Sequence, residues 1–242
     1  MTTLRPSRKP PKPSACWTPS KSQGIPLTFR LENARLGHPG QVVFTSLSLT
    51  IADGEKVALL GPSGAGKSTL LAALRQQQEV RCAWCPQTGD LVPMLSVFHN
   101  LYMGALPRNR TLTNLRNLIW PSAGEKASVG ELARELGLQD KLFTSVDQLS
   151  GGQAQRVALG RALYTQRPVL LADEPVSSLD EHQGLDLLQR ALARHPTAVV
   201  ALHDRELALQ CCDRIIGLGE GKILLDAPAS TLSLSDLDTL YQ

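Results

Sequence analysis

The sequence predicts an α/β fold with a mainly parallel sheet and an inserted helical section. Two observations lead to this prediction. Short, wholly apolar runs, typical of strands buried on both faces, alternate with helical stretches in the first and last thirds of the chain. Between them, residues from about Asp90 to Arg167 have a mainly helical pattern. A chain of 242 residues can bury a sizeable core, and its pattern shows no internal repeat.

Residues 1–24 differ in composition from the rest of the chain. They hold five of the 25 Lys and Arg residues and none of the 22 acidic residues, so the remainder carries a net charge of −2. Their many Pro, Ser and Lys residues cannot bury enough apolar area to offset the entropy of ordering. We predict a disordered, basic, Pro-rich tail at 1–24, followed by a single domain over 25–242.

The elements of the N-terminal core, residues 25–86, follow from local patterns. Two segments alternate between apolar and polar residues, as half-buried strands do, and another is apolar throughout. Ala52–Glu55 has the composition of a turn between them. The predicted elements are strands at Leu27–Leu31, Val42–Ile51, Val57–Leu60 and Val80–Cys85, with a helix from Lys67 to about Gln78.

The rest of the domain comprises a helical subdomain, about residues 87–167, and a C-terminal core, residues 168–242. One helix of the subdomain ends before Gly137, a glycine typical of the C′ position. Gly219 and Gly221 mark a hairpin. The predicted helices are Glu125–Leu136, Gly152–Tyr164, Glu181–Arg194 and Ser235–Leu240, and the predicted strands are Val169–Ala172, Ala198–Leu202, Arg214–Leu218 and Lys222–Leu225.

Several classes of protein are excluded or disfavoured. No apolar run approaches the roughly 18 residues that span a bilayer, and the N-terminus lacks the apolar stretch of a secretory signal. The slightly acidic body and the ten aromatic residues argue against nucleic-acid binding. Cys82 and Cys85 form a C-x-x-C pattern, which occurs in redox and zinc sites. The alternative is that the two thiols have no such function. We favour two thiols on or beside a buried strand, because a zinc site needs two more ligands.

Gly61–Ser68 fits the pattern G-x-x-x-x-G-K-[ST], follows an apolar strand and opens a helix. Its glycines let consecutive backbone N–H groups point inward as an anion nest, and the helix N-terminus adds positive potential. Lys67 supplies a mobile cation for β- and γ-phosphates, and Ser68 offers a hydroxyl to Mg²⁺. The segment therefore predicts a nucleoside triphosphate site.

Two further strands end in residues suited to this chemistry. Val169–Ala172 leads into Asp173, a ligand for Mg²⁺, and Glu174, a candidate to accept a proton from attacking water. His203 follows the apolar strand Ala198–Leu202. Because open parallel sheets bind ligands at the carboxyl ends of their strands, these residues should converge on one γ-phosphate.

Ser150–Gln153 begins another helix with a serine and two glycines. This is a second phosphate-binding N-terminus, which suits two chains that pair head to tail and complete each other's sites. The alternative is that Ser150 only caps the helix.

In this order, the motifs resemble those of the ATP-binding-cassette (ABC) ATPases over nearly all of residues 26–228. The resemblance adds Gln87 as the Q-loop glutamine, Ser177–Asp180 as the D-loop and Leu149–Gln153 as the signature. It implies a P-loop NTPase (RecA-like) core with an inserted helical signature subdomain, and two cassettes that sandwich two Mg·ATP. The catalytic residues would be Lys67, Gln87, Glu174 and His203, and the metal ligands Ser68, Gln87 and Asp173. The residues that bind ATP would be Gly61, Pro62, Ser63, Gly64, Ala65, Gly66, Lys67, Ser68, Thr69, Ser150, Gly151, Gly152, Gln153 and Asp180.

A finer resemblance is to the ATPases of phosphonate importers, carried by Leu95–Leu106, the region of Trp120 and the ending Ser235–Tyr241. It implies the ATPase subunit of an importer of a small oxyanion. Such a subunit forms a homodimer with bound ATP, works with integral-membrane permeases and indirectly with a substrate-binding protein, and is peripheral at the cytoplasmic face of the inner membrane. Two alternatives stay open: a soluble ABC ATPase outside transport, and a regulatory module that binds nucleotide without hydrolysis.

Two departures from the family pattern give further expectations. Only the 18 residues Thr69–Pro86 separate Ser68 from Gln87, which predicts a reduced antiparallel β-subdomain. No aromatic residue lies between Phe29 and Phe44, where the family places a ring that stacks on adenine. Leu36 and His38 lie nearest to that position.

Overall fold

The computed structural model describes residues 29–38, 40–87 and 90–241, and the predicted tail at 1–24 lies outside them. Within the described residues, no helix has the length and hydrophobicity needed to cross a membrane. The strands are β1 (Phe29–His38), β2 (Gln41–Ile51), β3 (Lys56–Leu60), β4 (Cys82–Cys85), β5 (Val169–Asp173), β6 (Thr197–Ala201), β7 (Arg214–Gly219) and β8 (Lys222–Pro228). The α-helices are α1 (Lys67–Gln77), α2 (Val97–Tyr102), α3 (Thr111–Ile119), α4 (Ala123–Glu135), α5 (Gly151–Tyr164), α6 (Glu181–Arg194), α7 (Arg205–Cys211) and α8 (Leu234–Asp238).

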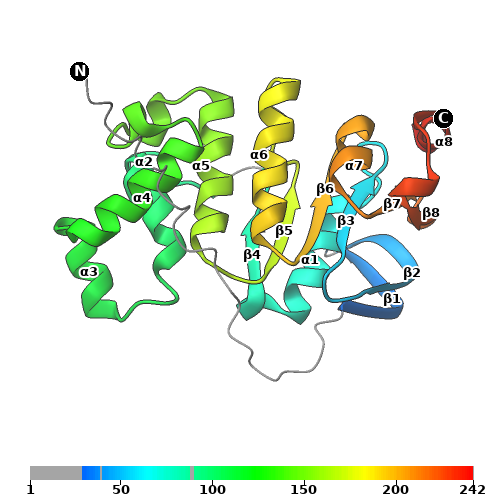
Figure 1. Cartoon of the computed structure of the whole chain (residues 1–242). Coiled ribbons are helices and arrows are strands. Elements are labelled where there is room, and N and C mark those ends of the chain that lie inside the picture. Colours follow the sequence, from blue (N-terminus) through cyan, green and yellow to red (C-terminus); the bar gives the residue numbers. More distant parts are fainter. Residues whose placement is uncertain (1–28, 39, 88–89, 242) are drawn as a thin grey trace, which may run out of the picture.

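A six-stranded sheet in the order β4-β5-β6-β3-β7-β8 forms the centre of the molecule. β4, β5, β6, β3 and β7 are parallel to their neighbours, and β8 pairs with β7 antiparallel. The short apolar runs at β3 and β5 are buried throughout, as strands covered on both faces should be. The predicted α/β fold with a mainly parallel sheet is therefore confirmed (Figure 1).

The two faces of this sheet bury different partners. On one face, alternate residues of the strands, such as Leu59 and Leu171, pack with α1 and with the β1–β2 hairpin. On the other face, residues such as Leu60 and Leu170 pack with α5, α6 and α7. Figure 1 shows α6 in front of the sheet and α1 behind it. The helices α2 to α5 lie between β4 and β5 in the chain, as the helical pattern predicted.

The antiparallel part of the N-terminal core consists, in the described residues, of the two strands β1 and β2. It is tied to α1, because the Gln77 side chain accepts a hydrogen bond from the backbone N–H of Arg30 and donates one to its carbonyl. The prediction that the first strand ends at Leu31 is wrong, since β1 continues to His38. Register shifts between Leu31 and Ala34, with Asn33 at a φ of 46°, interrupt the alternation on which that prediction rested.

The strand predicted at Val80–Cys85 starts later, because residues Glu79–Arg81 form a 3₁₀ turn. Cys82 packs on one face of the sheet and Cys85 on the other, as residues three apart in a strand must. Burial raises the pKa of Cys82 to about 11 and that of Cys85 to about 12. The structure thus favours two buried, inert thiols, and no metal-binding cluster occurs in the described part of the chain.

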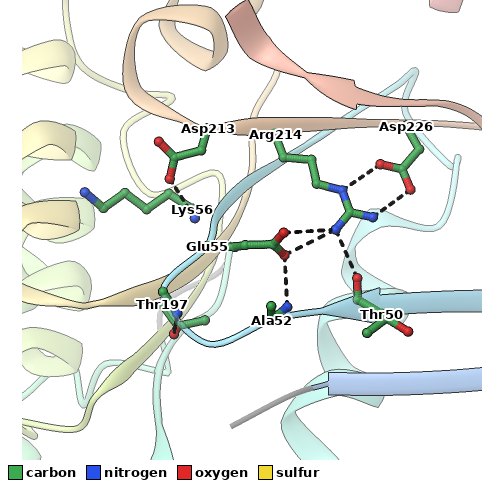
Figure 2. A network of polar contacts seen from close by, with 9 residues as sticks. Thr50, Ala52, Glu55, Lys56, Thr197, Asp213, Arg214 and Asp226 are labelled. Atoms are coloured by element: carbon green, nitrogen blue, oxygen red, sulfur yellow. Dashed lines mark hydrogen bonds and ion pairs between the residues drawn. The ribbon is translucent and has the colours of Figure 1, made fainter. Parts of the chain in front are cut away.

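Arg214, at the start of β7, joins the central sheet to the β1–β2 hairpin (Figure 2). Its guanidinium donates two hydrogen bonds to Asp226 on β8, of 2.6 and 2.7 Å, and one to the backbone carbonyl of Thr50 on β2. It also pairs with Glu55 at 3.2 Å, and Glu55 accepts from the N–H of Ala52. These contacts raise the pKa of Arg214, so the charge is firmly held.

We expect Arg214→Met to lower the free energy of unfolding by about 1–3 kcal/mol, because the two carboxylates lose their shared partner. Arg190→Met is the matched control, since Arg190 pairs with Asp186 one turn away on an exposed helix face. It should change stability by about 0.5 kcal/mol or less. Urea denaturation measures both variants, and equal losses would show that the Arg214 network adds nothing beyond a surface pair.

Candidate functional site

The predicted site residues follow three neighbouring strands of the central sheet. Gly61 follows β3, Asp173 ends β5, and His203 lies two residues after β6. The strand order β5-β6-β3 sets these three ends side by side at one edge of the sheet. This is the edge at which open α/β sheets bind ligands, and the three strand ends lie there as neighbours, whereas their convergence on one γ-phosphate stays a prediction.

The loop Gly61–Gly66 has the backbone conformation expected of an anion nest. Gly61, Gly64 and Gly66 all have positive φ, and Gly66 is the N-cap of α1. Lys67 is buried, and its Nζ donates to the carbonyl oxygens of Gly61 at 2.7 Å and Pro62 at 3.1 Å. Burial lowers the pKa of Lys67, while the charges of Glu174 and Asp173 act in the opposite direction.

Residues distant in sequence hold this loop in place. The N–H of Gly61 donates to the hydroxyl of Tyr241, and β2 packs so closely on Gly66 that a Cβ there would lie 2.6 Å from the Phe44 ring. On the outer side of α1, His38 Nε2 lies 3.4 Å from Thr69 Oγ1. Of the two residues that sequence analysis named near the base position, His38 therefore reaches the start of α1.

Asp173 is buried at the end of β5 and lies against the loop. Burial raises its pKa, and a hydrogen bond from Ser68 and the charges of Lys67 and His203 oppose that effect. A buried carboxylate and a nearby hydroxyl are hard oxygen ligands of the kind that Mg²⁺ takes together with phosphate oxygens.

Glu174 is the most constrained residue of the site. Its φ of 50° is rare for a residue with a side chain, and its N–H donates to the carbonyl of Ala201 on β6. The carboxylate is largely buried, and its Oε1 lies 2.6 Å from His203 Nε2. A strained backbone that presents a carboxylate to an imidazole is typical of a catalytic position, where the carboxylate can accept a proton from water.

The segment Ser150–Gln153 begins α5 with a capping box. Ser150 Oγ accepts from the N–H of Gln153, and Gln153 Oε1 accepts from the N–H of Ser150. The capping alternative is thus confirmed, and it leaves open a second role in binding phosphate. Gly152 packs against the D-loop, since a Cβ there would lie 2.9 Å from the carbonyl oxygen of Ser178.

Gln155, which no motif in the sequence marks, connects α5 to the residues after β5. Its amide donates to the carbonyl of Glu174 at 2.5 Å and to Ser177 Oγ at 3.0 Å, and its Oε1 accepts from the N–H of Ser178 at 2.8 Å. All three bonds join residues that are 19 to 23 positions apart. Gln155 therefore fixes the backbone from which the Glu174 carboxylate projects.

The remaining predicted residues lie at two clefts. A cleft of about 160 Å³ contains Glu174, His203 and Asp180, and Asp180 also caps α6 by accepting from the N–H of Gln183. A larger cleft of about 490 Å³ contains Gln87 and Gly151 together with Gln155. No hydrogen bond in the described part of the chain joins Gln87 to Ser68 or Asp173. The cleft that contains Gln87 and Gly151 includes no residue of the loop that holds Lys67.

We expect Gln155→Leu to lower kcat for nucleotide hydrolysis by about 10- to 100-fold with little change in KM. The leucine removes the hydrogen bonds that Gln155 makes with Glu174, Ser177 and Ser178, and these bonds hold the backbone that carries the Glu174 carboxylate. Gln155→Glu should recover only part of the rate, because it can accept from Ser178 but cannot donate to Glu174. Gln189→Leu on the exposed face of α6 is the control. A raised KM with unchanged kcat would contradict a positioning role.

Comparisons with known proteins agree with this geometry. Residues 44–177, more than half of the chain, match the family model described as ABC transporter. A curated relative, the phosphonates import ATP-binding protein PhnC of Pseudomonas putida, is 40% identical over 88% of this chain and 89% of its own length. The protein of the same name from Polaromonas sp. (strain JS666) is 36% identical over 89% of each chain.

Solved structures show the same fold. A bacterial ABC transporter cassette, solved as a dimer, is 26% identical, with a TM-score of 0.70 over 84% of this chain and 99% of that one. A dimeric ATP-binding cassette in a post-hydrolysis state, bound to ADP and Pi, is also 26% identical, with a TM-score of 0.68 over the same shares. The sequence, the arrangement of the strand ends and these relatives agree, and the chain belongs to the ABC transporter family as an ATP-binding cassette.

Proposed function

We propose that the chain is the ATP-hydrolysing subunit of an importer and powers the uptake of a small oxyanion, a phosphonate. The observation that carries the proposal is the Glu174–His203 pair, placed beside Asp173 and Lys67 at the ends of neighbouring parallel strands. This set of groups suits phosphoryl transfer from ATP to water. The choice of a phosphonate is supported by the names of the curated relatives.

Each residue has a distinct task in this proposal. The nest of Gly61–Gly66 and Lys67 binds the phosphates, with Ser68 and Thr69 at the start of α1. Glu174 orients water and accepts its proton, and His203 holds the γ-phosphate. Ser68, Asp173 and Gln87 are the oxygen ligands for Mg²⁺, and their hydroxyl, carboxylate and amide oxygens are of the kind that this ion prefers. When bound, Mg²⁺ supplies positive charge that offsets the charge on the β- and γ-phosphates.

A solved cassette of a bacterial ABC transporter is a dimer, and the curated relatives are named as import proteins. We propose that the N-terminus of α5 in one copy, Ser150–Gln153, and Asp180 complete the ATP site of the other copy. Within one copy, Gly151 at the start of α5 lies at a cleft that contains no residue of the Lys67 loop, which supports completion by a partner. The cassette would bind two permease subunits at the cytoplasmic face of the inner membrane, and through them a substrate-binding protein. No nucleic acid is expected as a partner.

The two alternatives from sequence analysis have less support. A regulatory module without hydrolysis would not need a buried carboxylate held at 2.6 Å from an imidazole by a strained backbone. A soluble ATPase outside transport does not match the import function that is printed for the curated relatives.

The test is a pull-down from detergent-solubilised membranes with the tagged Glu174→Gln variant in Mg·ATP, which should hold the closed dimer and its partners. We expect a protein with several membrane spans to copurify. Its substrate-binding protein is then titrated with phosphonates, phosphite, sulfate and selenate. Tight binding of sulfate alone would refute the choice of a phosphonate, and recovery of soluble partners or ribosomes alone would refute the importer.

A further inference from the structure

The last residues of the described chain pack against the strand next to the phosphate loop, Gly61–Gly66. After α8, the short 3₁₀ turn Thr239–Tyr241 lies against β7. Leu240 is largely buried and fills the space above Gly217, since a Cβ on Gly217 would lie 2.5 Å from its side chain. In the sheet, Gly217 pairs with Leu60, the last residue of β3 before the phosphate loop. Leu240 thus anchors the end of this turn next to the start of the phosphate loop.

Tyr241 contacts both the phosphate loop and the helix α7. Its hydroxyl accepts a hydrogen bond of 3.3 Å from the backbone N–H of Gly61. Its ring centre lies 5.6 Å from the guanidinium carbon of Arg205, the first residue of α7, and Arg205 also pairs with Asp238 on α8. Arg205 follows His203 by two positions. The Tyr241 side chain therefore lies between the phosphate loop and the helix that starts just after His203.

Gly61 is held on both sides of its Cα. Its N–H donates to Tyr241, and its carbonyl oxygen accepts from Lys67 Nζ at 2.7 Å. Lys67 donates a second bond, of 3.1 Å, to the carbonyl of Pro62. An ammonium has three N–H donors, so two phosphate oxygens can bind Lys67 only in competition with these carbonyls. Once Lys67 turns to phosphate, the Tyr241 hydroxyl remains as a contact that holds Gly61.

We infer that Tyr241 is a positioning residue for the phosphate loop and that its hydroxyl strengthens ATP binding. The inference rests on the function proposed above, in which ATP is the ligand. Loss of the hydroxyl costs more once Lys67 has released the Gly61 carbonyl, and a contact that favours the bound state raises affinity. Arg205 acts one step further away, because it keeps the Tyr241 ring in place. Neither role requires contact with the nucleotide.

The test compares steady-state ATP hydrolysis by the full-length chain and by Tyr241→Phe, which keeps the ring and removes the hydroxyl. We expect the KM for ATP to rise by about 3- to 10-fold, with kcat within about twofold of the parent value. Tyr164→Phe is the matched control, because its hydroxyl donates to Glu125 in the helical part of the chain. This control should leave KM unchanged. An unchanged KM in Tyr241→Phe, or a loss of kcat alone, would overturn the inference.

A double-mutant cycle tests the part played by Arg205. Arg205→Met should raise the KM for ATP by about twofold or more in the parent. It should add nothing in the Tyr241→Phe background, where no hydroxyl is left to place. Arg190→Met, which breaks a pair with Asp186 on an exposed helix face, should leave KM unchanged. Equal increases from Arg205→Met in both backgrounds would show that Arg205 does not act through Tyr241.

Hydrogen exchange of the Gly61 amide gives a second readout, which is local to the phosphate loop. With ATP and EDTA, which prevents turnover, residues 57–66 should exchange about 3- to 10-fold faster in Tyr241→Phe than in the parent. Exchange in α4 should stay the same. A lower midpoint of thermal unfolding, with KM and exchange at Gly61 both unchanged, would leave Tyr241 a structural role only.

The parent chain separates the two proposals. A parent that binds no ATP would refute the proposed function. Equal ATP binding by the parent and Tyr241→Phe would refute the positioning role of Tyr241 and leave the proposed function standing.

Discussion

Glu174→Gln should slow ATP hydrolysis by about 10²- to 10⁴-fold and leave ATP binding intact. The glutamine keeps the size of the side chain and the strained backbone at a φ of 50°, but its amide cannot accept the proton of water. Binding should be spared because, in the proposed site, the Gly61–Gly66 nest and Lys67 hold the phosphates rather than this carboxylate. The ATP-bound dimer should therefore accumulate, which size-exclusion chromatography in Mg·ATP measures directly.

A matched control lies in the same cleft. Glu181, in the first turn of α6, contributes to the cleft that contains Glu174 and is exposed. Glu181→Gln should retain nearly the full rate. His203→Ala in the Glu174→Gln background should cost far less than it does in the parent, because the two side chains are in contact and act together. Hydrolysis by Glu174→Gln at the parent's rate would exclude Glu174 as the base.

The second large effect is expected at the first glycine of the phosphate loop. Gly61 has a φ of 143°, and a Cβ on it would lie 2.1 Å from the carbonyl oxygen of Leu218 on β7. The Leu218 carbonyl group belongs to the backbone of a sheet strand, so it cannot easily move away from the added Cβ. We expect Gly61→Ala to lower the free energy of unfolding by about 3–5 kcal/mol, from the strain at positive φ and from the clash together.

Gly64 separates these two causes. Its φ is 83°, but a Cβ there would meet nothing within 4 Å. Gly64→Ala should therefore cost only the strain, about 1–2 kcal/mol. Urea denaturation gives both values, and ATP titration at low temperature tests whether folded Gly61→Ala has lost affinity. Similar losses for the two variants would show that the contact with Leu218 relaxes, contrary to this account.

Local sequence was enough to predict most of the elements and the centre of the site. The apolar runs at β3, β5 and β6, the glycine spacing of the loop and the residues that follow each strand are all properties of short segments. Because parallel strands must bring their carboxyl ends to one edge, the meeting of Asp173 and His203 beside Gly61 followed from the pattern. The error at β1 has a local cause too, since its register shifts break the alternation.

Contacts between distant segments could not be predicted in this way. Tyr241 reaches Gly61 across 180 positions, and Gln155 reaches Ser178 across 23, so no spacing in the sequence marks either pair. The periodicity of α3 is visible in its residues, but which side faces inward depends on the buried hydroxyl of Tyr102.

The identity of the phosphate loop, the two carboxylates and the histidine thus follows from the order of residues, because local backbone geometry and strand ends carry that information. The angle at which Glu174 is held, the anchoring of Gly61 and the orientation of α3 follow from packing. They depend on hydrogen-bond partners that come together only when the sheet, its helices and the C-terminal residues have assembled.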